Sequence, residues 1–417
     1  MFLFSVLSYF DRTIMSVAGP RIIQDFGISE TQMGAVYSAF LLGYAVMMIP
    51  AGYLIDRVGP WRALIGMGFG AALFTGLTAW AINPGFGSLI GIVPPLITVR
   101  FLMGACTAPL YPACGRMNAN WFAITRRGLV WGFVAAGAGI GSALSPSLFS
   151  WMIPNYGWRK SFGLAGAMTA VLSAVWAWYA RDRPTEYKFN PSTESASKIH
   201  PEPEYSGRSP KFGFRKLLTN RNVMLLAIGY MSVGYFEYIF FYWIYYYFGQ
   251  VRHMSHAETS TYTTAIFLAW VLMTPLGGWF SDHLIRRLGK RIGRPIVPAF
   301  CILLSALLLF LGTHASNSSM VGVLLAISFG LASASDGSFW AATIDAGGEN
   351  TGAACGVLNT GSNIGGFIAP VLTPFIASLA GWTSAMYFAC LVAAVGVTIW
   401  FLLETPKLKI SNEYGVL

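Results

Sequence analysis

The chain has 417 residues, of which 55% are hydrophobic and only 11% are charged, and its mean hydropathy is +0.56. Because soluble domains carry roughly 25% charged residues, this composition excludes an ordinary soluble protein and predicts an integral membrane protein. The formal net charge of +10 would fit a nucleic-acid-binding protein, but the positions of the basic residues, described below, argue against that class.

Hydrophobic segments long enough to cross a bilayer recur about twelve times. We expect them near residues 2–23, 33–55, 61–82, 88–115, 128–152, 159–180, 221–248, 260–284, 295–314, 319–343, 350–378 and 382–403. Many of the 46 glycines lie inside these segments, and small residues let membrane helices pack closely. The sequence therefore predicts an all-α membrane protein with twelve transmembrane helices.

Residues 181–220 interrupt this pattern, because they are polar and rich in proline and serine. Such a composition is typical of a flexible linker. We therefore predict an N-terminal six-helix bundle (1–180), a cytoplasmic linker (181–220), a C-terminal six-helix bundle (221–404) and a cytoplasmic tail (405–417).

The two predicted bundles repeat each other. Eight residues of the first recur in the second at one constant spacing: Gly128, Gly132, Gly137, Ile140, Gly141, Pro146, Gly157 and Trp158 match Gly352, Gly356, Gly361, Ile364, Gly365, Pro370, Gly381 and Trp382. Two parallel repeats predict a pseudo-two-fold axis along the membrane normal and a binding site between the two halves.

The basic residues fall mostly on one side of the predicted membrane. That side holds 21 of the 27 lysines and arginines, while the other side holds Arg21, Arg159, Lys160 and Arg252, and Arg12 and Arg100 lie within segments. The positive-inside rule then places both termini and the linker in the cytoplasm. We expect a multi-pass protein of the plasma (inner) membrane, and the basic charge does not imply a nucleic-acid partner.

The first segment contains two opposite charges, Asp11 and Arg12, within the stretch YFDRTIMSVAGP (residues 9–20). A charge at the centre of a membrane helix costs roughly 2.5–3.5 kcal/mol on insertion scales. Neighbouring helical residues point about 100° apart, so the two side chains need not satisfy each other. We interpret them as functional residues, against the alternative of a structural pair in the bundle.

The second segment ends in a glycine-aspartate motif, Gly52-x-x-x-Asp56-Arg57, and its repeat is Gly278-x-x-x-Asp282. In this loop the chain resembles the major facilitator superfamily, and the resemblance extends to the number of segments, the linker and the repeat. It implies that Asp56, Arg57 and Asp282 are gating residues that hold one state of an alternating-access transporter.

A closer resemblance is to the anion:cation symporter branch, which includes bacterial sugar-acid/proton symporters such as the galactonate and hexuronate transporters. The matching stretches are YFDRTIMSVAGP (9–20), SAFLLGYAVMMIPAGYLIDRVG (38–59), RFLMGACTAPLYPACGRMNANWF (100–122) and GVLNTGSNIGGFIAP (356–370). By position, the resemblance implies that Arg12 and Arg100 bind the substrate anion, that Tyr44 and Asn359 contact it, and that Asp11 couples transport to protons.

One position departs from that branch. Thr107 stands where many sugar-acid symporters carry a glutamate in the fourth helix, so the proton stoichiometry or route is open. Glu237 and Asp336 also lie within predicted segments and either replace that proton site or form salt bridges with Arg12 or Arg100. Among many aromatic residues of the seventh segment, Tyr238 is a candidate to line the cavity.

No enzyme motif, cofactor site or metal site is evident, and the five cysteines lack CxxC spacing. We therefore expect a monomeric, proton-coupled symporter of a small organic anion, such as a sugar acid or another carboxylate. An organophosphate or anion exchanger of the same fold, and a receptor that binds a solute without transporting it, are the alternatives.

Overall fold

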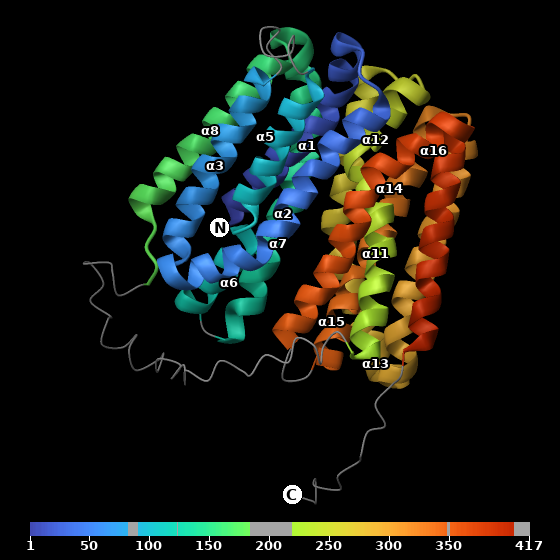
Figure 1. Cartoon of the computed structure of the whole chain (residues 1–417). Helices are drawn as coiled ribbons and strands as arrows, with labels where there is room; N and C mark the ends of the chain where they lie inside the picture. The colour runs from blue at the N-terminus through green and yellow to red at the C-terminus, as the bar shows by residue number, and fades with distance from the viewer. Residues whose placement is uncertain (82–90, 123, 184–218, 348–350, 404–417) are drawn as a thin grey trace, which may run out of the picture.

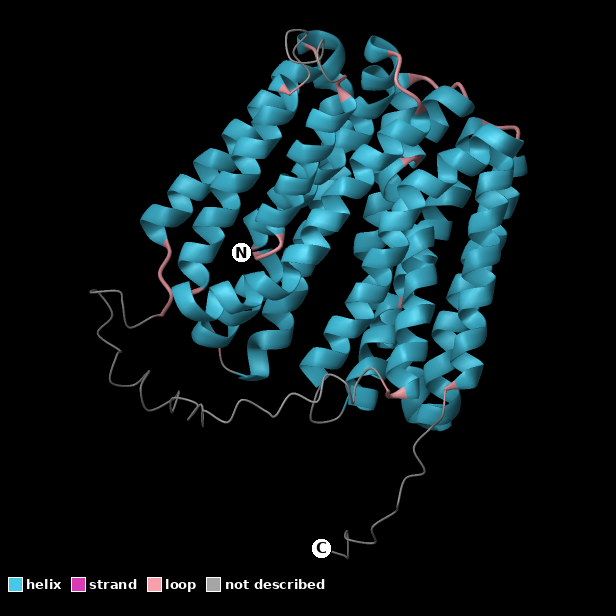
Figure 2. Ribbon diagram, in the orientation of Figure 1, coloured by secondary structure: helices cyan, strands magenta, loops and turns pink. Residues whose placement is uncertain are grey.

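The computed structural model describes residues 1–81, 91–122, 124–183, 219–347 and 351–403. These residues form helices and short connections, with no strand among them (Figure 2). Most of the predicted linker and the whole predicted tail lie outside the described residues.

The first group of helices packs in pairs along its length (Figure 1). Helix α1 packs against α7, α2 against α5, and α3 against α8. The elements are α1 (Phe2–Phe26), α2 (Glu30–Val58), α3 (Pro60–Trp80), α5 (Val93–Thr107), α6 (Leu110–Trp121), α7 (Ile124–Tyr156) and α8 (Trp158–Tyr179).

The second group packs in the same way, with α11 against α16 and α13 against α14. Its elements are α11 (Arg221–Tyr242), α12 (Ile244–Tyr246), the π-helix η2 (Tyr247–Val251), α13 (His256–His314), α14 (Ser318–Ala334), α15 (Asp336–Gly347) and α16 (Thr351–Leu402). Two of these are pairs of helices joined at a sharp bend, which lies at Gly289 in α13 and at Gly381 in α16.

Nine stretches of the described helices are long and apolar enough to cross a membrane. The stretch in α16, Ala354–Leu402, contains the bend at Gly381 and so holds two arms. Helices α1 and α2, with 25 and 29 residues, are also long enough to span. The predicted all-α membrane architecture is confirmed.

The repeated glycines have a structural reason in both groups. Gly157 and Gly381, at φ 79° and 85°, adopt a backbone conformation that L side chains rarely tolerate, where the chain turns into the next helix. A Cβ atom on Gly141 would lie 2.0 Å from the carbonyl oxygen of Val6, and one on Gly365 would lie 2.0 Å from that of Met231. The repeat thus encodes the close crossings of α1 with α7 and of α11 with α16.

The two groups are joined over only part of their length. We call the end of the bundle where α8 ends and α11 begins the linker end, and the opposite end the far end. Near the far end, Gln24 donates a hydrogen bond to Gln250 (3.2 Å), and the Ser38 hydroxyl donates to the carbonyl of Phe367 (2.7 Å). In Figure 1 the two groups meet in this region and separate toward the linker end.

We expect Gly141→Ala and Gly365→Ala to destabilise the protein by about 1–3 kcal/mol, because the added methyl groups would push packed helices apart. Gly132→Ala and Gly356→Ala are matched controls on the same two helices, where a Cβ atom would meet nothing within 4 Å. Thermal unfolding of the purified variants measures the difference. Equal stability of all four variants would contradict this account of the repeat.

Candidate functional site

Helix α1 carries its two charged residues into the centre of the bundle. Asp11 is 0% exposed and Arg12 is 6% exposed. The helix packs against α7, α8, α11 and α12 as well as against α2 and α3, so its middle has no lipid-facing side. Because a buried charge is costly unless other groups solvate it, the neighbours of these two residues define the site.

The guanidinium group of Arg12 is surrounded by aromatic side chains. Its Nε and Nη2 atoms donate hydrogen bonds to the hydroxyl oxygens of Tyr242 (3.3 Å) and Tyr238 (2.7 Å). Its Cζ atom lies 5.0 Å from the ring centres of Phe40 and Tyr238, distances at which cations are attracted to aromatic faces. Since both tyrosines belong to α11, Arg12 joins the two groups of helices.

Arg100 is fully buried but only weakly solvated by the protein. It donates hydrogen bonds to the sulfur of Met103 (3.1 Å) and to the backbone carbonyl of Arg12 (3.3 Å), and its Nε has no partner among the described residues. Its Cζ atom lies 5.5 Å from the ring centre of Phe40. The two guanidinium groups therefore share one aromatic neighbour, and no ion pair among the described residues involves either of them.

Asp11 turns away from Arg12 toward α8. Its Oδ2 atom accepts a hydrogen bond from the Thr169 hydroxyl (2.8 Å), while Oδ1 is buried without a partner among the described residues. Arg100 interacts with Asp11 electrostatically but lies beyond ion-pair distance. Neighbouring charges on α1 thus have separate surroundings, as the angle between adjacent helical residues requires.

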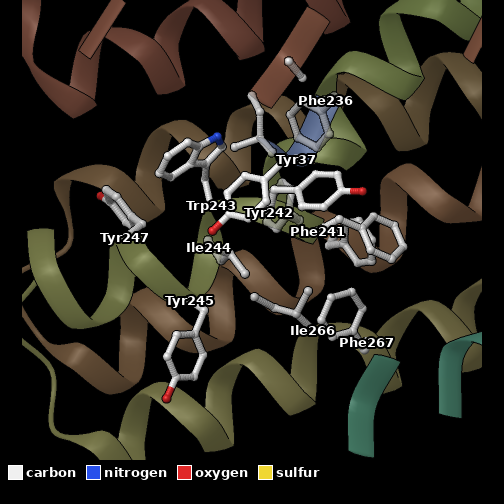
Figure 3. Close-up of a cluster of buried hydrophobic side chains, with 14 of the residues drawn as sticks. Tyr37, Phe236, Phe241, Tyr242, Trp243, Ile244, Tyr245, Tyr247, Ile266 and Phe267 are labelled. Atoms are coloured by element: carbon white, nitrogen blue, oxygen red, sulfur yellow. The ribbon is translucent and has the colours of Figure 1, made fainter. Parts of the chain in front are cut away.

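Several more aromatic residues surround the two guanidinium groups, and we call this region the arginine site. Tyr37 stacks on Tyr242, with ring centres 4.9 Å apart, and Figure 3 shows these two rings among the buried side chains of α11 and α12. Tyr44 stacks on Phe40, with ring centres 6.3 Å apart. Asn359 is not among these residues. It lies where α16 crosses α2, and its amide contacts the sulfur of Met48 (3.5 Å).

Glu237 and Asp336 form a second polar cluster between α11, α14 and α15. Glu237 is 9% exposed, accepts a hydrogen bond from Ser333 (3.2 Å) and interacts electrostatically with Asp336. Asp336 interacts with the hydroxyl of Tyr230. The structure therefore places these two carboxyl groups with each other and does not pair them with Arg12 or Arg100.

The predicted gating residues lie at the linker end. Arg57 and Asp282 are exposed, and the side chain of Asp56 lies outside the part of the chain that the structure describes. The carboxylate that binds this loop is Asp182, which accepts a hydrogen bond from the backbone N–H of Trp61 (2.7 Å) at the start of α3. The sequence interpretation missed Asp182 because it assigned that residue to the linker.

Several residues of the arginine site were not predicted, among them Phe40, Thr169 and Tyr9, whose ring centre lies 5.4 Å from the Cζ atom of Arg12. Tyr9 lies three residues before Arg12, and Phe40 lies four residues before Tyr44, so each shares a helix face with a predicted residue. Helical spacing could therefore have indicated both. Thr169 has no such signal, because only the packing of α8 against α1 brings it to Asp11.

Comparisons with known proteins agree on the class of this chain. A family model described as Major Facilitator Superfamily matches residues 1–346 and 284–415. A probable sulfoacetate transporter of Cupriavidus necator is 26% identical and covers 91% of this chain and 86% of its own length. A hexuronate transporter of Bacillus subtilis is 26% identical, and the match covers 93% of this chain and 89% of that protein. A D-galactonate transporter of Escherichia coli is also 26% identical, and the match covers 97% of this chain and 94% of that protein.

Solved structures show the same fold. A crystal structure of a bacterial homologue of the human lysosomal transporter Spinster, in an inward-facing and occupied conformation, superposes with a TM-score of 0.77 at 16% sequence identity. The match covers 96% of this chain and 94% of that one.

We expect Thr169→Val to destabilise the protein by about 1–3 kcal/mol, because it removes the 2.8 Å hydrogen bond to the buried Asp11 carboxyl and leaves only the interaction of that carboxyl with Thr75 among its hydroxyl neighbours in the described residues. Thr169→Ser keeps the donor and should restore most of the stability. Ser173→Ala, on the same helix, removes a hydroxyl that bonds only to the backbone of its own helix and should cost less. Thermal unfolding measures all three, and equal losses for Thr169→Val and Ser173→Ala would refute the role assigned to Thr169.

Proposed function

Because this chain belongs to the major facilitator superfamily and is a multi-pass membrane transporter, we propose that it carries a small organic anion together with protons by alternating access. The relatives named above are transporters of sugar acids or of sulfoacetate. These names support a carboxylate or sulfonate of similar size as the substrate, with galactonate-like and hexuronate-like sugar acids first.

The observation that carries this proposal is the pair of buried arginines that have no carboxylate partner among the described residues. Arg12 uses neutral tyrosine hydroxyls, and Arg100 uses a sulfur atom and a backbone carbonyl. Guanidinium groups remain charged inside proteins and can bind a carboxylate through two parallel hydrogen bonds. An anion between the two groups would place a negative charge within ion-pair distance of Arg12 and Arg100, which no described carboxylate does.

The tyrosine side chains of the arginine site suit a substrate anion that carries hydroxyl groups. The hydroxyl groups of Tyr238 and Tyr242 now accept hydrogen bonds from Arg12, and each can turn to a substrate hydroxyl once a carboxylate takes over the guanidinium. Tyr44 adds a half-buried phenol beside Phe40. We include Asn359 as a substrate contact in a state of the transporter in which the α2–α16 crossing has moved, because its present neighbour is Met48.

Asp11 is the proposed proton-coupling carboxyl. Apolar surroundings favour its neutral form, whereas a nearby guanidinium favours the charged form. When an anion binds Arg100, it offsets the positive field at Asp11, so anion and proton binding assist each other. Two carboxyl groups in one buried site are rarely ionised at the same time, because their negative charges repel. We therefore propose Glu237 and Asp336 together as the second proton site. They would take the role of the fourth-helix glutamate, whose position is occupied by Thr107 in this chain.

Alternating access requires the two groups of helices to separate at one end at a time. We propose that the groups are the two predicted six-helix domains and that the linker end faces the cytoplasm, where most of the lysines and arginines lie. Asp56, Arg57 and Asp282 would then act at the cytoplasmic end as gating residues. Asp182 joins them, because its bond to Trp61 fixes the start of α3.

We expect Arg100→Gln to abolish the binding of the transported anion. A thermal-shift screen with D-galactonate, D-glucuronate and sulfoacetate at two pH values identifies the ligand, since a ligand at 100 times its Kd stabilises the folded state by about 2.7 kcal/mol. Arg100→Gln should lose this shift, and Arg286→Gln, an exposed arginine at the linker end, should keep it. A full shift in Arg100→Gln would contradict the proposed anion site.

We expect Asp11→Asn to uncouple transport from protons. In sealed proteoliposomes, the variant should fail to accumulate substrate in response to a pH gradient, yet it should still exchange internal for external substrate. Full gradient-driven uptake by Asp11→Asn would exclude Asp11 as the coupling residue. Strict exchange by the unmodified protein, with no response to pH, would instead favour an anion exchanger.

A further inference from the structure

A cavity of about 740 Å³ opens at the far end of the bundle, away from the arginine site. It lies between the two groups of helices, because its lining comes from the end of α1, the α7–α8 connection, and the segment from α12 to the start of α13. We call it the far-end vestibule. None of the residues that are proposed to bind the substrate anion or protons lines it.

The lining of the vestibule is positively charged. It contains three basic residues, Arg21, Arg159 and Lys160, and one acidic residue, Asp25. Asp25 is itself engaged, since one carboxylate oxygen bonds to Arg21 (2.9 Å) and the other accepts a hydrogen bond from the indole N–H of Trp158 (3.1 Å). The lining therefore has an excess of positive charge however its members pair.

The sequence shows how unusual this concentration is. The far side of the predicted membrane carries only four lysines and arginines, and three of them line this one cavity. Glu30 and Glu258, two acids near the same end, lie outside the lining, where they interact with Tyr246 and with the N-terminus of α13. The basic residues thus converge on the vestibule.

The vestibule leads toward the arginine site. Val17, which lines it, is five residues from Arg12 on α1, a distance of roughly 7.5 Å along a helix. Tyr245, also in the lining, follows Tyr242 after one turn of α11 and α12. The groups of helices touch at the vestibule itself, because Gln24 and Gln250, which are hydrogen-bonded to each other, both belong to its lining.

We propose that the far-end vestibule is an anion-capture site, in which an organic carboxylate or sulfonate from the external solution collects before the far end opens. This proposal rests on the proposed function for the identity of the anion. A concave site with one sign of charge raises the local concentration and the association rate of oppositely charged solutes by about 10-fold or more at low salt. Arg159 and Lys160 supply this field, and Arg159 is positioned by the ring of Trp158, 4.5 Å from its Cζ atom.

The charge of the vestibule can be measured without any transport. In a Ser150→Cys variant, the lining thiol is labelled with an anionic and a cationic methanethiosulfonate reagent, and the ratio of the two rates reports the local potential. A Ser378→Cys variant, exposed in α16 outside the vestibule lining, is the matched control, and the unmodified protein gives the background from the native cysteines. Tyr156→Cys is a second lining position.

We expect the anionic-to-cationic ratio at the lining thiol to exceed that of the control about tenfold at low salt. The excess should disappear after Arg159→Gln and Lys160→Gln, and it should shrink as added salt screens the charges. Equal ratios at the lining and control positions would overturn the proposed field.

The kinetics of transport then test whether the vestibule captures the anion. With D-galactonate, D-glucuronate and sulfoacetate as probes, the Arg159→Gln/Lys160→Gln variant should show a KM about three- to tenfold higher at low salt, with kcat unchanged and the difference lost at high salt. Normal uptake with an unchanged KM would refute capture while leaving the proposed function intact. If the unmodified protein transports none of the three anions, the proposed function fails for these substrates, and the thiol-labelling ratio alone decides whether the vestibule attracts anions.

Discussion

The rest of this structure depends on two guanidinium groups that are buried in the centre of a helix bundle, where no carboxylate of the described residues forms an ion pair with either of them. Each arginine is stabilised by weaker partners, namely aromatic faces, tyrosine hydroxyls, a sulfur atom and a backbone carbonyl. A carboxylate would satisfy these donors better than the neutral groups that now do so. The protein thus keeps two positive charges buried, at some cost in stability, and the proposed anion would neutralise them.

The position of this pair fits its proposed role in transport. Arg12 belongs to the first group of helices, while the tyrosines that solvate it belong to the second. A ligand that takes over the guanidinium therefore changes a contact between the two groups, and a difference in contacts is what allows binding to shift a conformational equilibrium. Close glycine crossings pack each group internally, as at Gly141 and Gly365, and one more, Gly34 of α2 against the carbonyl of Pro370 in α16, joins the two groups.

Under the proposed function, the charged residues at the two ends of the bundle have different roles. At the linker end, the abundant basic residues are the basis of the proposed orientation in the membrane, and Asp182 accepts a hydrogen bond from the start of α3. At the far end, few charges are present, but they gather around one cavity between the groups. The interior between the ends holds the arginine site, and the second cluster, Glu237 with Asp336, lies apart from it.

The sequence by itself determined the membrane class, the helical segments and the internal repeat, and it singled out Asp11, Arg12 and Arg100 as candidate site residues, because hydropathy, glycine spacing and intramembrane charge are local properties of the chain. Only the tertiary structure decided the partners: Thr169 for Asp11, Tyr238 and Tyr242 for Arg12, and Asp336 for Glu237. Asp182 and the far-end vestibule also appeared only in three dimensions. The physical reason is that these contacts join residues distant in sequence, and the packing of helices, rather than any spacing along the chain, sets which side chains face each other.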